Sequence, residues 1–183
     1  MKNILEIKDL KIIVDDSKKT LVEHLSLKIP ELSIVGLVGG SGSGKTTTGL
    51  SILKLLSSAL TTEKGEIIFE GKNLLRESDD YMHRLRGKEI SMIFQEPLEA
   101  FNPVFTLGKQ IEEVLEIHTN FNKKKRHERI LELCSLVGLK EPRRVLQSYP
   151  HQLSGGMAQR ALIAMALVCQ PKLLIADVTT TGR

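Results

Sequence analysis

The 183-residue sequence predicts an α/β core with an inserted helical subdomain, and three observations predict it. Short segments that alternate apolar and polar residues open the chain, as expected of β-strands with one buried face. From Gly108 to Val137 the apolar residues recur at helical spacing. An apolar run that ends in Asp177 predicts a final buried strand. With a hydrophobic content of 41%, the chain is long enough to bury a core.

The first half of the chain is rich in predicted strands. "ILEIKDLKIIV" and "LVEHLSLKI" predict two antiparallel strands that are joined by the turn residues 15–19. "LSIVGLVGG" predicts a buried strand that enters a glycine-rich loop, and "TTTGLSILKLLSSAL" predicts the helix that follows. "GEIIFEG" and "EISMIF" predict two further short strands.

Helices dominate the second half. "GKQIEEVLEIH" and "KKKRHERILELCSLVGL" predict two amphipathic helices, and "GGMAQRALIAMALVC" predicts a third that is apolar nearly all round and therefore buried. This third helix is expected to stop ahead of Pro171. We therefore predict an α/β core over residues 1–95 and 166–183 and a helical subdomain over residues 96–165.

Composition excludes several functional classes. The net charge of +4 is mild, and the basic run 123–126 has no interleaved aromatics, so it predicts a solvated helix start and no nucleic-acid partner. Cys134 and Cys169 lie in apolar periodic segments without metal-ligand spacing, which predicts reduced core residues of a cytosolic protein. The N-terminus has no apolar signal region, and no run is long enough to span a bilayer.

A phosphate-binding loop is the most specific motif. Residues 39–46, "GGSGSGKT", fit the pattern G-x-x-x-x-G-K-[ST] between a predicted strand and a predicted helix. Glycines let consecutive backbone N–H groups wrap a phosphate, and the helix N-terminus adds positive dipole. Lys45 is expected to meet the β/γ-phosphates and Thr46 to hold Mg²⁺. The residues expected to bind a nucleoside triphosphate are Gly39, Gly40, Ser41, Gly42, Ser43, Gly44, Lys45, Thr46 and Thr47.

A second motif, "LSGGMAQR" at residues 153–160, places Ser-Gly-Gly at the start of a helix. A hydroxyl and exposed N–H groups there could meet an anion, but a simple N-cap with a glycine turn explains the motif equally well. The order of motifs along the chain is more informative. The phosphate loop is followed by "FQEP" with Gln95, then by "LSGGM", and then by "LLIAD" with Asp177.

This order resembles that of the ATP-binding subunits of ABC transporters, and the resemblance covers the chain up to Asp177. It implies a P-loop NTPase core with an antiparallel β subdomain, in which Lys45 and Thr46 belong to the Walker A loop. Gln95 would be the Q-loop residue that contacts Mg²⁺ and reports to the permease. Asp177 would be the Walker B aspartate, so that Thr46, Gln95 and Asp177 surround the Mg²⁺. The signature that closes on the ATP of the opposite subunit would comprise Ser154, Gly155, Gly156 and Met157.

The resemblance narrows to one branch of the family. Met157 stands where the family usually has glutamine, and "LSGGM" followed by "QR" is similar to the peptide/nickel import branch. Within that branch, Gly40 and "AFNP" at residues 100–103 are most similar to nickel-import ATP-binding proteins. The resemblance therefore implies uptake of nickel or a nickel chelate, with a dipeptide or oligopeptide importer as the alternative. The five histidines are dispersed, so a nickel ligand within this chain is not expected.

The resemblance also implies partners and a location. ATP and Mg²⁺ would be the cofactors, and the partners would be permease subunits, a second ATP-binding subunit of the same or a related kind, and an extracytoplasmic substrate-binding protein. The chain would be peripheral, at the cytoplasmic face of the cell membrane. Residues 96–107 resemble a permease-contacting loop, with Phe101 and Phe105 as expected contacts. That loop argues against a soluble ABC ATPase of DNA repair or translation.

Two departures from the family bear on mechanism. No aromatic residue precedes Phe69, although the family usually stacks adenine on one, so Ile12, Ile13 or Val14 would have to substitute. Val178 replaces the glutamate that polarises the attacking water, a role worth about 10²–10⁴-fold in rate.

The chain also ends before the family's D-loop and switch histidine. A truncated nucleotide-binding fragment that cannot hydrolyse ATP is therefore a further alternative, and Val178→Glu alone is not expected to restore turnover.

Overall fold

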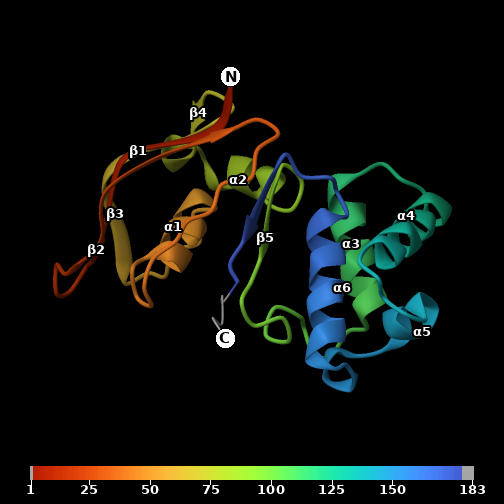
Figure 1. Cartoon of the computed structure of the whole chain (residues 1–183). Helices are drawn as coiled ribbons and strands as arrows, with labels where there is room; N and C mark the ends of the chain where they lie inside the picture. Colours follow the sequence, from red (N-terminus) through yellow and green to blue (C-terminus); the bar gives the residue numbers. More distant parts are fainter. Residues whose placement is uncertain (1, 179–183) are drawn as a thin grey trace. The chain divides into compact units, whose positions relative to one another are not determined.

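The chain forms two compact units, Met1–His83 and Arg84–Arg183, in a computed structural model that describes residues 2–178 (Figure 1). The sequence predicts a different division, into a core and a helical subdomain with boundaries at residues 95/96 and 165/166. That division remains a prediction. The last five residues of the predicted core segment 166–183 lie outside the described residues.

Unit 1 is built on an antiparallel sheet with the strand order β2-β1-β3-β4. The strands are β1 (Asn3–Val14), β2 (Thr20–Pro30), β3 (Leu60–Phe69) and β4 (Lys72–Asn73). The predicted hairpin of β1 and β2 is confirmed, because Leu5 pairs with Ile29 and Ile12 with Val22. One face of this sheet forms the core of the unit, and its most buried side chains are those of Leu5, Ile7, Leu10, Ile12, Ile67 and Phe69.

The buried strand predicted for residues 32–40 is absent from the described chain, and that prediction is wrong. Ile34 and Val38 are almost completely exposed, at 102% and 94% of the reference area. A strand needs a neighbour that bonds its N–H and C=O groups, and no described strand pairs with this segment. Glycines within it further disfavour an extended ladder.

Helix α1 (Lys45–Ile52) follows the glycine-rich loop and is shorter than predicted. The predicted helix extends to residue 60, but Lys54 has a left-handed backbone with φ of 50°. The Leu55 N–H donates back to the Leu50 carbonyl at 2.9 Å, as in a Schellman-type helix end. This turn stops the helix and frees Leu60 to begin β3.

Unit 2 contains a parallel pair of strands, β5 (Ile90–Ile93) and β6 (Leu173–Ala176), and both strands are as predicted. All four residues of β5 are buried. Strand β6 is less buried than predicted. Leu173 is only 7% exposed, but Leu174 is 38% exposed. The physical reason is that β5 is the one described strand that pairs with it.

Four α-helices lie wholly within the described part of unit 2: α3 (Leu107–His118), α4 (Lys123–Leu136), α5 (Pro142–Gln147) and α6 (Gly155–Leu167). The three predicted helices are confirmed, whereas α5 was not predicted. In Figure 1, α6 lies beside β5 and α3, which it contacts. Cys134 lies in the core of these helices, and burial raises the pKa of its thiol. Cys169 is partly buried, and burial raises its thiol pKa as well.

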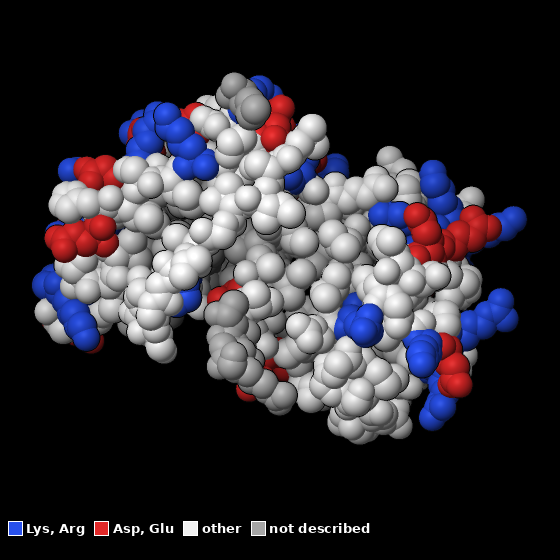
Figure 2. Space-filling model, in the orientation of Figure 1, with Lys and Arg blue, Asp and Glu red and all other residues white. Residues whose placement is uncertain are grey.

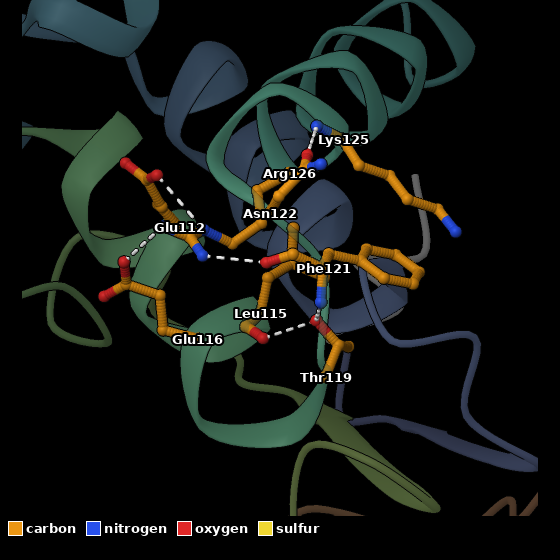
Figure 3. Close-up of polar contacts among 8 residues, drawn as sticks. All are labelled: Glu112, Leu115, Glu116, Thr119, Phe121, Asn122, Lys125 and Arg126. Atoms are coloured by element: carbon orange, nitrogen blue, oxygen red, sulfur yellow. Dashed lines mark hydrogen bonds and ion pairs between the residues drawn. The ribbon is translucent and has the colours of Figure 1, made fainter.

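Arg126 joins α3 to α4 through a small polar network (Figure 3). Its Nε donates to the Glu112 carboxylate at 3.2 Å and its Nη2 to the Glu116 carboxylate at 2.6 Å. Its Nη1 donates to the Phe121 carbonyl at 2.9 Å, within the connecting turn. The basic run 123–126 is thus a helix start, as predicted: Asn122 caps α4 by accepting from the Lys125 N–H.

Charges of both signs are mixed on the surface. On the face that Figure 2 shows, Lys and Arg side chains lie among Asp and Glu side chains over both units. No helix within residues 2–178 is long and apolar enough to cross a membrane. The same residues contain no group of three or more His, Cys, Asp or Glu side chains placed to hold a metal ion.

We predict that Arg126→Leu lowers the free energy of unfolding by about 1–3 kcal/mol, because it leaves two carboxylates and a carbonyl without their shared donor. The Arg126 side chain is only 16% exposed. Lys124→Leu on the same helix is the matched control: Lys124 is 85% exposed and 4.0 Å from Glu128. That control should change stability by less than about 0.5 kcal/mol. Urea unfolding followed by circular dichroism compares them, and equal small changes would contradict the assignment.

Candidate nucleotide-binding site

The glycine-rich loop 39–46 takes its shape from two glycines with left-handed backbones. Gly42 has φ of 76° and Gly44, the N-cap of α1, has φ of 87°. A Cβ at Gly44 would lie 2.7 Å from Cγ2 of Val22 and 2.9 Å from the Leu21 carbonyl oxygen. Gly44 therefore lets the loop turn sharply into α1 while it lies directly against β2.

Lys45 holds its charge inside the loop. Its Nζ donates to the carbonyl oxygens of Gly39 at 2.8 Å and Gly40 at 2.7 Å, and it lies 3.4 Å from the Ser43 hydroxyl. An anion in the loop would exchange these neutral acceptors for charged oxygens, which form stronger bonds with an ammonium group.

The start of α1 adds further positive potential. The first N–H groups of a helix have no intrahelical acceptor, and α1 has no acidic residue in its first turn to offset its dipole. Thr48 fixes this turn, because its N–H and its hydroxyl both donate to the Gly44 carbonyl at 2.8 Å. Ser41, Gly42 and Thr46 are exposed to solvent. The loop and helix start together offer a positively polarised site for an anion, and phosphate binding there remains a prediction.

The aliphatic residues suggested as a base platform are mostly unavailable. Ile12 and Ile13 are 0% and 5% exposed, because both pack into the core of unit 1. Val14, at the end of β1, is partly exposed. Of the three, Val14 alone could contact a base.

In unit 2, Gln95 and Asp177 follow the strands β5 and β6 at the same end of the strand pair. Ile93 of β5 pairs with Ala176 of β6, and the Asp177 N–H donates to the Ile93 carbonyl at 2.9 Å. Because the strands are parallel, the residues that follow them emerge from one end of the pair. A carboxylate and an amide oxygen are hard donors that suit Mg²⁺. Thr46, the third predicted Mg²⁺ residue, belongs to unit 1, so its place beside the other two remains a prediction.

The serine of "LSGGM" begins α6. Ser154 is the N-cap, and its hydroxyl accepts from the Met157 N–H at 3.4 Å. Gly155 and Gly156 are exposed, and a Cβ at either would meet nothing within 4 Å. This open space is what a close approach by another molecule would require. The Met157 side chain packs partly against the helical core, as a thioether can where glutamine would not.

Comparison with known proteins decides the family. A family model described as ABC transporter matches residues 22–181, which include the loop, Gln95, Ser154 and Asp177. The chain belongs to the ABC transporter family. The assignment of loop 39–46 as the family's Walker A loop remains a prediction.

This ABC transporter chain is similar to several peptide transport proteins. It is 45% identical over 185 residues to the oligopeptide transport ATP-binding protein AppD of Bacillus subtilis, with 100% of the chain and 56% of the relative covered. It is 43% identical over 161 residues to the dipeptide transport ATP-binding protein DppD of Escherichia coli, with 88% and 49% covered. The probable peptide ABC transporter ATP-binding protein y4tR of Sinorhizobium fredii is 43% identical, with 98% and 54% covered. The chain thus spans about half the length of these relatives.

Solved structures agree with the fold. The ATP-binding cassette MJ0796, a dimer in a post-hydrolysis state bound to ADP and Pi, matches with a TM-score of 0.83 and 27% identity. That match covers 94% of this chain and 73% of the cassette. CbiO1 of Clostridium perfringens matches with a TM-score of 0.78 at 21% identity, over 100% of this chain and 68% of its own. The predicted P-loop NTPase fold of the ABC ATPase type is confirmed.

We predict that Gly44→Ala lowers the free energy of unfolding by about 1–3 kcal/mol, from its left-handed backbone and its overlap with β2. Gly40→Ala is the matched control in the same loop, since a Cβ there meets nothing within 4 Å. The control should cost less than about 0.5 kcal/mol. Urea unfolding measures both variants, and an equal cost for the two would refute the close packing described for Gly44.

Proposed function

We propose that the chain is the ATP-binding subunit of an ABC importer for peptides and that it binds MgATP through residues 39–47. The observation that carries the proposal is the glycine-shaped loop that holds the Lys45 ammonium beside the start of α1. ATP is proposed as the nucleotide because MJ0796, a solved ATP-binding cassette similar to this chain, is bound to ADP and Pi.

Peptides are favoured over nickel as the transported substrate. The sequence alone favoured nickel, on Gly40 and the residues 100–103. The similar proteins AppD, DppD and y4tR are instead named for oligopeptide, dipeptide and peptide transport, at 43–45% identity over most of this chain. Agreement over so many positions outweighs a few residues at two places in the chain.

Mg²⁺ would be held by oxygen donors from three places. The hydroxyl of Thr46 would bind it beside the phosphates, and Gln95 and Asp177 would contribute from the shared edge of β5 and β6. The bound ion would neutralise phosphate charge as the nucleotide reacts.

A membrane permease would contact the segment 96–107, which follows Gln95. Val104 is 69% exposed, Leu98 44% and Phe105 37%, an apolar surface that suits an apolar partner. Phe101 is only 4% exposed and packs in the helical core, so its predicted role as a contact is corrected to a structural one. The chain would sit peripherally at the cytoplasmic face of the membrane, with a substrate-binding protein joining the complex on the other side.

A second ATP-binding subunit would complete the assembly. The exposed glycines after Ser154 leave room for a nucleotide held by that subunit, and the start of α6 would face its phosphates. The second subunit could be another copy or a related chain, as in the dimeric cassette MJ0796.

ATP hydrolysis at this chain's own site would be slow. Val178 directly follows Asp177 and is 53% exposed, and an isopropyl group neither accepts a proton nor orients a water molecule. If the second subunit is a related chain, this chain would bind ATP at its own site, and its Ser154 would complete the catalytic site of the second subunit.

We predict that Lys45→Ala weakens MgATP binding by about 10–100-fold, because a charged donor to the phosphates is lost. Lys19→Ala, in the exposed turn between β1 and β2, is the matched control and should bind like the wild type. Isothermal titration calorimetry measures both, and unchanged affinity in the Lys45 variant would rule out the proposed site.

We predict that the chain releases no phosphate from ATP above the Lys45→Ala background. Joining residues 1–178 to the C-terminal part of AppD gives two matched chimaeras, one with Val178 and one with Val178→Glu. The glutamate chimaera should turn over at least about 100-fold faster, the scale of general-base assistance. Equal rates in the two chimaeras, or turnover by the unmodified chain, would contradict the role assigned to Val178.

A further inference from the structure

The loop 102–106 lies between two buried anchors. Phe101 on one side is 4% exposed and Leu107 on the other is fully buried, both within the helical core. The Leu107 N–H also donates to the Ser148 carbonyl at 3.0 Å, which fixes the start of α3. Between these anchors, Val104 and Phe105 project outward at 69% and 37% exposure.

Gln110, one turn into α3, bonds to this loop with every polar atom of its side chain. Its Oε1 accepts from the Asn102 N–H at 2.8 Å. Its Nε2 donates to the carbonyl oxygens of Asn102 and Phe105, each at 3.0 Å. Only a neutral primary amide of this length offers one acceptor and two donors in that arrangement.

Two further contacts complete the loop. The Asn102 carboxamide oxygen accepts from the Val104 N–H at 3.1 Å, and the Phe105 N–H donates to the Asn102 carbonyl at 3.4 Å. The Lys109 Nζ lies 4.0 Å from the centre of the Phe105 ring, so the ring carries a positive charge over one face. These contacts hold the backbone of the loop that carries the exposed apolar pair.

We propose that Gln110 is a positioning residue for permease contact: it fixes loop 102–106 so that Val104 and Phe105 dock without first being ordered. The inference rests on the proposed function, because the permease is the partner that this loop would meet. Association is weakened when a flexible segment must be ordered on binding, and a loop that is already fixed avoids that cost. Gln110 would act through the loop and not by touching the permease.

Two Gln110 variants and one matched control test this inference. Gln110→Ala removes all three bonds, and the isosteric Gln110→Glu keeps an acceptor for Asn102 but sets an anionic oxygen against two carbonyls. Glu113→Gln is the reverse isosteric change, at an exposed position of the same helix. Each chain is co-expressed with candidate peptide-permease subunits from its own genome. Capture in detergent is measured together with MgATP affinity and amide hydrogen exchange.

Both Gln110 variants should keep their MgATP affinity yet bind the permease about tenfold or more weakly than the wild type. Glu113→Gln should bind like the wild type, and Phe105→Asp should not bind. In Gln110→Ala, the Asn102 amide should exchange about tenfold or more faster, because it has lost its acceptor.

Normal permease binding by the Gln110 variants, with Phe105→Asp inactive, would overturn the inference and leave the proposed function standing. Unchanged exchange at Asn102 would overturn it as well, since Gln110 would then not hold the loop. Failure of the wild-type chain itself to capture the permease would instead overturn the proposed contact, and the inference with it.

Discussion

The parallel pairing of β5 with β6 is the constraint on which unit 2 depends. The two strands lie far apart in the chain: β5 precedes the helices α3 to α6, and β6 follows them. The pairing begins where the N–H groups of Lys172 and Leu173 both donate to the Glu89 carbonyl. It ends where the Asp177 N–H reaches Ile93, and this last bond sets Asp177 at the edge that Gln95 also leaves.

Ser91 of β5 pairs with Leu174 of β6, and these partners are 83 residues apart in the chain (174 − 91). The four helices α3 to α6 lie within that interval. One pair of strands therefore closes the whole helical segment into a single unit.

Much of this arrangement could be predicted from the sequence, because the signals are local. Alternation in β1 and β2, helical spacing in α3, α4 and α6, and the glycines before Lys45 each act through near neighbours. The predictions that failed depend on which distant residues a segment contacts, and local sequence patterns do not show this. Residues 32–40 are apolar enough for a buried strand, but a strand forms only where a neighbour bonds it. Phe101 and Phe105 look alike in sequence, yet one lies in the core and the other on the surface.

The site shows the same division. The loop 39–46 was predictable because its chemistry depends on consecutive residues, whereas the role of Gln110 depends on a fold-back of eight residues from Asn102. Nothing in "GKQI" distinguishes that glutamine from a solvated helix residue. Val178 is the reverse case: its identity alone carries the proposal of slow hydrolysis, and the structure adds only that its side chain is half exposed.

The central claim is that this chain serves peptide uptake as an ATP-binding subunit, and uptake by intact cells tests it most directly. Cells that lack the gene would be compared with cells that carry the wild-type chain or its Lys45→Ala variant, using a radiolabelled oligopeptide and radioactive nickel in parallel. The account predicts that peptide uptake is lost without the gene and restored by the wild-type chain alone, while nickel uptake is unchanged throughout. Loss of nickel uptake with normal peptide uptake would contradict it.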